Sequence, residues 1–102
     1  MDLRTKIIVE YKLDDIVTNI VNDNIESEQK IELSTPIKPL CSDLDFMGIL
    51  MDVEEEFSAE ISDDEAENLN TINDIVKWLM KNISEEELEE YGILNIDDEE
   101  ED

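Results

Sequence analysis

The side chains that could do chemistry in this chain are carboxylates, a single cysteine and a few serines, because histidine is absent. General acid–base catalysis by Asp or Glu requires burial or close charge coupling that brings the pKa near neutrality, and pairs such as Asp63 and Asp64 are expected on a solvent face. Cys41 has no obvious basic partner that would stabilise its thiolate. We therefore expect that the protein is not an enzyme.

Metal binding is the second chemistry that carboxylates can supply. A calcium site of the EF-hand type needs Asp-x-Asp-x-Asp-Gly spacing, and neither Gly48 nor Gly92 stands in such a sequence. We expect no metal site; loose cation occupancy that relieves repulsion between the carboxylates stays open as an alternative.

The formal net charge of −24, from 31 acidic and 7 basic residues, indicates the class of partner. Nucleic acid is not an expected partner, because phosphate contacts are made mainly by Lys and Arg, and an anionic membrane would repel the chain. Partner enzymes with a basic patch would be attracted in a salt-dependent way. The alternative is that the charge serves solubility alone. We expect a monomer.

Cysteine content and hydropathy indicate the compartment. Cys41 is the only cysteine, so no disulfide can form within the chain, which fits a reducing compartment. Residues 1–15 contain an apolar run too short for a secretory core, and no stretch approaches the ~20 apolar residues of a membrane span. We expect a cytoplasmic protein.

Helical periodicity is present in the elements that must position these side chains. Apolar residues recur at helical spacing in residues 13–21, and we favour continuation of this helix through residues 6–11 over a lone strand there. A second helix begins at Ser42 or Asp43, which can both cap it. Its predicted core-facing stripe is Leu44, Met47, Leu50, Met51 and Val53.

Three further helices are predicted from their start signals. Ser62 with Glu65 and Ser84 with Glu87 have the form of capping boxes, and residues 70–71 offer a cap for the helix between them. The apolar residues expected inward on that middle helix are Ile72, Ile75, Val76, Leu79 and Met80.

A long loop is predicted between the first two helices, over residues 22–41. Pro36 and Pro39 disfavour helix in the residues that precede them. Isolated apolar residues would attach the loop to the core: Ile25, Ile31, Leu33, Ile37 and Leu40.

Residues 42–79 resemble the acyl carrier protein signature, and no gap is needed. The family pattern is Asp-Ser-Leu-(Asp/Glu), an amphipathic helix ending near Glu-Glu-x-Phe, an extended Glu-Ile, an acidic Asp-x-Glu-Ala turn and a Thr-Val-type start of the last helix. This chain has Ser-Asp-Leu-Asp at 42–45, Glu-Glu-Phe at 55–57, Glu-Ile at 60–61, Asp-Asp-Glu-Ala at 63–66 and Thr-Ile at 71–72.

The resemblance implies a fold and a division of the chain. We expect an all-α, acyl-carrier-like four-helix bundle with a long first loop and an appended short C-terminal helix. The expected division is a helical N-terminal extension over 1–12, the carrier-like domain over 13–82, an appended helix and turn over 83–96 that Gly92 closes, and a disordered acidic tail over 97–102.

The resemblance also implies a prosthetic group. In the family a serine holds a 4'-phosphopantetheine arm, whose thiol carries the acyl group. At that position this chain has Asp43, whose carboxylate cannot form the stable phosphodiester, and Ser42 lies immediately before it. Three interpretations stay open. Ser42 accepts the arm one residue out of place, at a helix start that favours phosphate; or both residues only cap the helix in a non-carrying relative; or Asp43 is a deliberate replacement that blocks modification.

A partner surface on the acidic second helix is a further implication of the resemblance, because partner enzymes of the family grip this helix with Arg and Lys. The matching residues are the acidic Asp45, Asp52, Glu54 and Glu55, with apolar contact from Phe46 and Met47. The alternative is an ordinary solvated helix face.

The family shelters acyl chains in a methyl-lined interior. Its expected lining here is Leu44, Met47, Met51, Phe57, Ile61, Ile72 and Val76. Two functions follow from the resemblance. The first is an acyl carrier protein, or a specialised relative, of fatty-acid, polyketide or related synthesis. The second is a non-carrying interaction module that lacks the arm.

Overall fold

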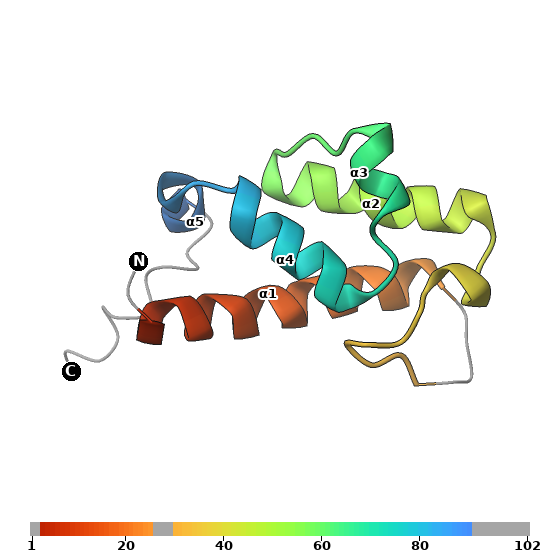
Figure 1. The fold of residues 1–102 in the computed structure, drawn as a ribbon, viewed down its shortest axis with the longest axis horizontal. Helices are drawn as coiled ribbons and strands as arrows, with labels where there is room; N and C mark the ends of the chain where they lie inside the picture. Colours follow the sequence, from red (N-terminus) through yellow and green to blue (C-terminus); the bar gives the residue numbers. More distant parts are fainter. Residues whose placement is uncertain (1–2, 26–29, 91–102) are drawn as a thin grey trace.

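The fold is known from a computed structural model that describes residues 3–25 and 30–90 (Figure 1). These residues form helices and connecting loops, with no strand among them, so the expected all-α class is confirmed. The elements in chain order are α1 (Leu3–Asn24), the short 3-10 helix η1 (Lys38–Leu40), α2 (Asp43–Phe57), α3 (Asp63–Glu67), α4 (Ile72–Asn82) and α5 (Glu85–Glu90).

Helix α1 is longer than the apolar stripe over residues 13–21 indicates. It runs without a break through residues 6–11, so the lone-strand alternative for that segment is wrong and the helical continuation is confirmed. Its buried residues follow one another at four-residue spacing: Val9, Leu13, Val17 and Val21. That row is the face along which α1 packs against both α4 and α2.

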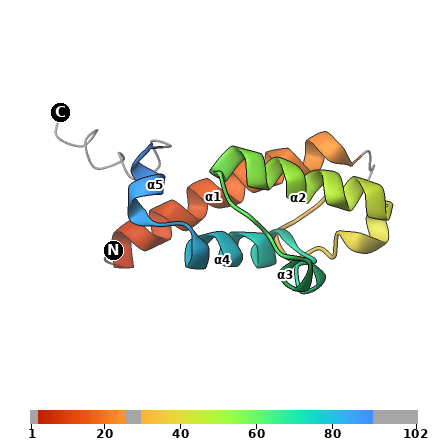
Figure 2. The same cartoon turned by 90° about the horizontal axis from the view of Figure 1, so that it is seen from above.

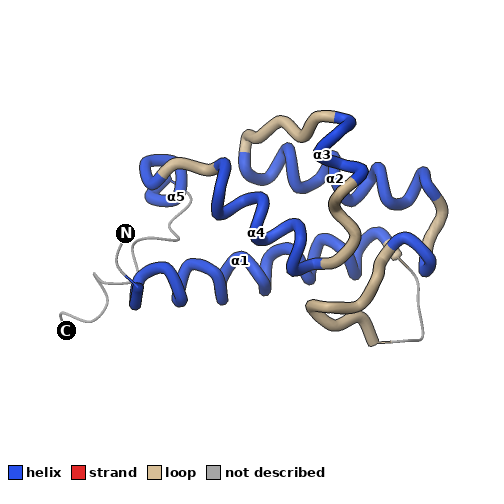
Figure 3. The backbone as a smooth tube through the Cα atoms, viewed as in Figure 1, coloured by secondary structure: helices blue, strands red, loops and turns tan. Residues whose placement is uncertain are grey.

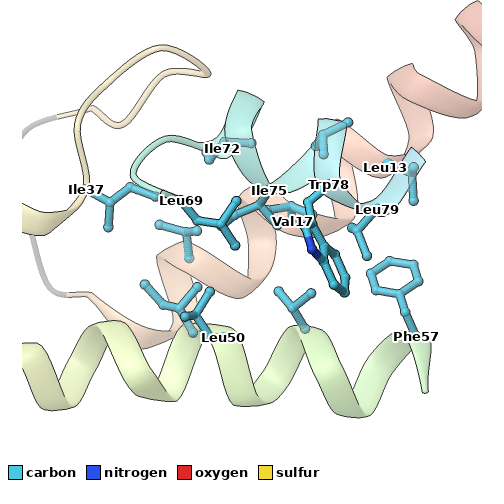
Figure 4. Packing of buried hydrophobic residues seen from close by; sticks show 14 of the residues in the cluster. Leu13, Val17, Ile37, Leu50, Phe57, Leu69, Ile72, Ile75, Trp78 and Leu79 are labelled. Atoms are coloured by element: carbon cyan, nitrogen blue, oxygen red, sulfur yellow. The ribbon is translucent and has the colours of Figure 1, made fainter. Parts of the chain in front are cut away.

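Helix α4 supplies the opposite wall of the core. Its start is fixed by a capping box in which the Thr71 hydroxyl accepts the Asp74 N–H and the Asp74 carboxylate accepts the Thr71 N–H. Its apolar residues meet those of α1 and α2 in one continuous cluster (Figure 4). The buried members from α4 are Ile72, Ile75, Val76, Trp78 and Leu79.

The described part of the first loop, drawn in tan in Figure 3 apart from η1, is attached to the core through buried side chains and hydrogen bonds. Ile31 and Ile37 are buried, and the Ile37 N–H donates to the Asn70 carbonyl at 2.7 Å. The Leu33 carbonyl accepts the Asn73 N–H at 3.0 Å. The loop is therefore joined to the α3–α4 junction by backbone hydrogen bonds, which holds its last residues in place before α2.

Helix α5 begins with the predicted capping pair. The Ser84 N–H donates to the Glu87 carboxylate, and the Ser84 hydroxyl accepts the Glu87 N–H. Leu88 is 2 % exposed and belongs to the main core cluster. The predicted closure at Gly92 and the acidic tail over 97–102 lie outside the described residues, and the proposed division of the chain stays a prediction.

Candidate functional site

The segment around the family's serine position begins a helix, as the sequence predicts. Ser42 is the N-cap of α2, with extended backbone at φ −79° and ψ 166°, and its Oγ accepts the Asp45 N–H at 3.1 Å. Asp43 is the first residue of the helix, and both Ser42 and Asp43 are exposed. The Ser42 hydroxyl therefore lies at the N-cap position, and the Asp43 carboxylate lies at the first helical position.

Cys41, which directly precedes this cap, is held as a neutral thiol. Its Sγ donates to the Ile37 carbonyl at 3.6 Å. Burial raises the pKa of the Cys41 thiol, and the neighbouring Asp45 and Asp43 carboxylates raise that pKa further. A nucleophilic cysteine needs the opposite shift, so this direction of the pKa disfavours ionisation of the Cys41 thiol.

The face that α2 turns to the core differs from the predicted stripe. Its buried residues are Phe46, Ile49, Leu50, Val53 and Phe57. Leu44, Met47 and Met51 are instead 79 %, 57 % and 56 % exposed, so the prediction that they face the core is wrong. The predicted and the observed rows of apolar residues both fit helical spacing. The row from Phe46 to Phe57, which includes two aromatic rings, is the one that packs against α1 and α4.

A groove of about 270 Å³ is lined by residues of η1, α2, α3 and the segment between α2 and α3. Figure 2 shows how these helices are arranged. Its lining residues are Lys38, Asp43, Phe46, Met47, Leu50, Met51, Glu54, Ile61, Asp63, Ala66 and Glu67. From the expected interior lining, Met47, Met51 and Ile61 contribute to it. Phe57, Ile72 and Val76 are buried in the core, and Ile61 packs against it, so these four residues lie in the interior as expected. The expectation of an interior position is wrong for Leu44, Met47 and Met51, which are exposed.

Lys38 also belongs to the site, although it is not among the site residues expected from the sequence. Its Nζ donates to the Glu67 carbonyl at 3.1 Å and lies 5.3 Å from the centroid of the Phe46 ring. The first loop, α2 and α3 are thereby joined beside the groove. A usable signal is present in the sequence: a lysine stands between two prolines just before the signature, in a chain with only 7 basic residues.

The expected partner-binding residues fall into two groups. Asp45, Met47 and Glu55 are exposed on the outer side of α2. Asp52 is exposed as well, but its Oδ2 accepts Asn24 Nδ2 at 2.8 Å and so ties α2 to α1.

The second group is directed inward. Glu54 is half-buried, and its Oε2 accepts the Ile61 N–H at 2.7 Å, which holds the chain between α2 and α3. Phe46 is only 8 % exposed and forms a groove wall under Lys38. The outer apolar surface of α2 is therefore made by Leu44, Met47 and Met51.

The described residues contain neither a cluster of metal ligands nor a helix that could cross a membrane. No group of three or more potential metal ligands is found among residues 3–25 and 30–90. Within the same residues, no helix has the length and apolarity that crossing a membrane requires.

Comparison with known proteins shows a family relationship. No protein-family model matches the chain, and no solved structure matches it significantly. A curated relative is the acyl carrier protein of Buchnera aphidicola subsp. Schizaphis graminum, which is 36 % identical over 72 residues. The match covers 70 % of this chain and 89 % of the relative. Together with the helical bundle and the signature around Ser42, this similarity shows that the chain belongs to the acyl carrier protein family.

Proposed function

We propose that the protein acts as a carrier protein of fatty-acid, polyketide or related synthesis, and that Ser42 is the residue to which the phosphopantetheine arm is attached. The observation that supports this proposal is an exposed hydroxyl at the N-cap of α2, one residue before the family's serine position. The next residue, Asp43, lines the apolar groove. An arm on Ser42 would thus start beside that groove.

Of the two side chains at this site, only that of Ser42 has the chemistry to hold the phosphopantetheine arm. The Asp43 carboxylate cannot hold the arm as a phosphodiester, whereas the Ser42 Oγ is a primary hydroxyl at the start of a 15-residue helix. The free amides and dipole of a helix start favour a phosphate. When bound, the arm would supply a terminal thiol that carries an acyl group; the chain's own residues would anchor it at Ser42 and offer Met47 and Met51 as apolar surface.

Three features oppose this role, and a transferase must overcome them. The Ser42 hydroxyl already accepts the Asp45 N–H, and loss of such a cap costs about 1 kcal/mol. Asp43 and Asp45 place two carboxylates in the first turn, where a phosphate would sit. A one-residue shift also turns the side chain by about 100° around the helix.

These same features favour a second candidate, the non-carrying interaction module. There, Ser42 would serve only as a cap and the acidic face of α2 would be the functional surface. Both candidates use the same face of α2. Its exposed carboxylates are Asp45, Asp52 and Glu55, which surround Met47, while Phe46 and Glu54 lie behind them. In both cases the partner is an enzyme with a basic patch.

Incubation with coenzyme A and a broad-specificity phosphopantetheinyl transferase distinguishes the two candidates. The expected result is a mass increase of one arm on the intact protein, which Ser42→Ala abolishes. Ser62→Ala is the matched control, because Ser62 is also an exposed cap whose hydroxyl accepts the N–H three residues on. That control should be modified like the parent protein.

The reciprocal variant sharpens the result. Asp43→Ser restores a hydroxyl at the family position and should be modified at least as fast as the parent protein. If Asp43→Ser takes up the arm and the parent protein does not, with several transferases, the carrier role fails and the interaction module remains.

The acidic surface is tested by transferase binding against ionic strength. Asp45→Asn with Glu55→Gln should slow association, and the difference from the parent protein should shrink as salt rises. Glu86→Gln with Glu89→Gln on α5 is the control, since it removes the same charge from other exposed positions. Equal slowing by both pairs would show that net charge, and not the α2 face, attracts the partner.

A further inference from the structure

An apolar stripe lies on the outer side of α1, near its start. Leu3, Ile7 and Tyr11 are 72 %, 57 % and 74 % exposed, and their four-residue spacing places them on one face of the helix. Val9 and Leu13, from the same turns, are fully buried on the side of the core. Three large apolar side chains in a row form a patch rather than scattered exposure, and such patches mark contact surfaces.

The charge at the N-terminal end of this stripe is opposite to the net charge of the molecule. Arg4 and Lys6 are exposed in the same turns, although the chain has only 7 basic residues and a net charge of −24. The first turn of α1 contains no acidic residue, whereas α2, α3, α4 and α5 all have at least one there. The positive end of the α1 dipole therefore adds to two cations. This face suits a segment that is both apolar and acidic.

Helix α5 brings the end of the described chain to the same end of the bundle as this stripe. Figures 1 and 2 both place α5 beside the N-terminal turns of α1. Leu88 of α5 and Val9 of α1 belong to the same buried cluster, which holds α5 at this end of the bundle. The chain therefore leaves α5 at the end of the bundle where the stripe lies (Figure 1), and residues 91–102 would have to pass around α1 to reach its outer side.

The sequence that follows Glu90 has the chemistry that this face requires. Residues 91–96 read YGILNI, with Ile93, Leu94 and Ile96, and residues 97–102 read DDEEED. Extended, residues 91–102 can span up to roughly 40 Å, whereas the stripe from Leu3 to Tyr11 is only about 12 Å long. The segment therefore reaches the whole stripe.

The order of the two parts also gives a direction. Glu10 and Asp14 lie near Tyr11 and would repel the acidic run there, while Arg4 and Lys6 lie at the opposite end. The apolar part would contact the stripe first, and the acidic run would then end beside the cations at the helix start.

We propose that residues 91–102 bind back onto α1, with Ile93, Leu94 and Ile96 against the stripe and the acidic run against Arg4 and Lys6. The contact needs little intrinsic affinity, because a short tether gives the segment a millimolar effective concentration. The stripe is then an intramolecular surface, and the strongest run of negative charge in the chain is held at the end of the bundle opposite Ser42.

A spin label on the tail tests this contact in the full chain. Glu99→Cys in a Cys41→Ser background provides a single attachment site for a nitroxide, and amide peak intensities are read by NMR. The expected result is loss of intensity for residues 3–12, with residues 43–50 of α2 unaffected. Ile93→Ser with Ile96→Ser, and separately Arg4→Glu with Lys6→Glu, should restore the lost intensity, as should high salt in part.

The controls separate this proposal from its alternatives. Lys30→Glu with Lys77→Glu makes the same charge change at exposed residues away from the stripe and should leave the effect intact. A mixture of labelled unenriched protein with unlabelled isotope-enriched protein reports contacts between copies. Intensity loss at residues 3–12 in that mixture would assign the stripe to a second copy and overturn the proposal. No loss at residues 3–12 in the labelled chain would overturn it as well.

Discussion

Helices α4 and α2 both look amphipathic in the sequence, but they use their apolar residues differently. On α4 the apolar side chains are buried, apart from Met80, which is half-buried. On α2 five apolar side chains are buried, and a further three, Leu44, Met47 and Met51, remain exposed. Helix α2 therefore has apolar surface beyond what the core needs, which is expected of a helix that also binds something else.

The charged residues of the two helices differ as well. Helix α4 combines Asp74 with Lys77 and Lys81, whereas α2 has no basic residue and carries acidic residues at 43, 45, 52 and 54–56. An apolar patch framed by carboxylates selects a partner that is apolar and basic. We therefore propose that α4 serves mainly stability and that the outer face of α2 serves recognition, and the predictions below test this division.

The largest expected effect is the loss of a core side chain from α4. Leu79 is fully buried, so Leu79→Ala should lower the free energy of unfolding by about 2–5 kcal/mol. Met47→Ala on the exposed side of α2 should change it by less than about 1 kcal/mol. Urea unfolding followed by Trp78 fluorescence measures both. Similar losses for the two variants would mean that the outer face of α2 is packed, and the assignment would fail.

The second effect concerns a part of α2 that contributes to stability. The Glu54 carboxylate accepts the Ile61 N–H, and Glu54→Ala leaves that half-buried donor without its partner, at a cost of about 1–3 kcal/mol. Glu55→Ala removes the same charge from an exposed position and should stay within about 0.5 kcal/mol. The Ile61 amide should also exchange faster in Glu54→Ala. An unchanged exchange rate would show that the hydrogen bond does not hold the α2–α3 connection.

The third effect tests how α2 is joined to α1. Asn24 Oδ1 would lie 3.0 Å from a Cβ added at Gly48, and the Asn24 amide donates to Asp52. Gly48→Ala gains about 1 kcal/mol of helix propensity but displaces Asn24, whose hydrogen bond is worth a similar amount, so the net change in stability should be near zero. In an Asn24→Ala background the same substitution should stabilise by about 1 kcal/mol. Equal effects in both backgrounds would show that Asn24 does not restrict Gly48.

The sequence predicts most of the fold, because its signals are local. The reciprocal caps at Ser62, Thr71 and Ser84 and the apolar spacing of α4 are readable without tertiary information. The face of α2 is not, since Phe46 and Met47 both belong to helical rows and only contacts with α1 and α4 decide which row is buried. The inward direction of Glu54 and the contacts of Lys38 with α2 and α3 are set by the folded arrangement, so the sequence pattern can mark Lys38 as unusual but does not indicate what either side chain contacts.

The smallest effect is electrostatic and concerns the start of α2, where recognition and attachment are proposed to meet. Burial, then the Asp45 carboxylate, then the Asp43 carboxylate raise the pKa of the Cys41 thiol, so Asp43→Asn should lower that pKa without changing burial. At a fixed pH below the pKa a larger fraction of the thiol is then ionised, and alkylation of Cys41 should be faster than in the parent protein. The measurement is the alkylation rate as a function of pH, with the midpoint shifted to lower pH in Asp43→Asn.

Asp52→Asn is the matched control for this measurement, because it removes one charge from the same helix farther along, where Asp52 does not contribute to the pKa of Cys41. An equal shift in both variants would mean that Cys41 responds to the net charge of the protein and not to Asp43. A shift confined to Asp43→Asn would show that the Asp43 carboxylate acts on groups at the cap of α2. The same carboxylate would then oppose a phosphate on Ser42, which makes the alkylation profile an independent measure of the barrier that a transferase meets there.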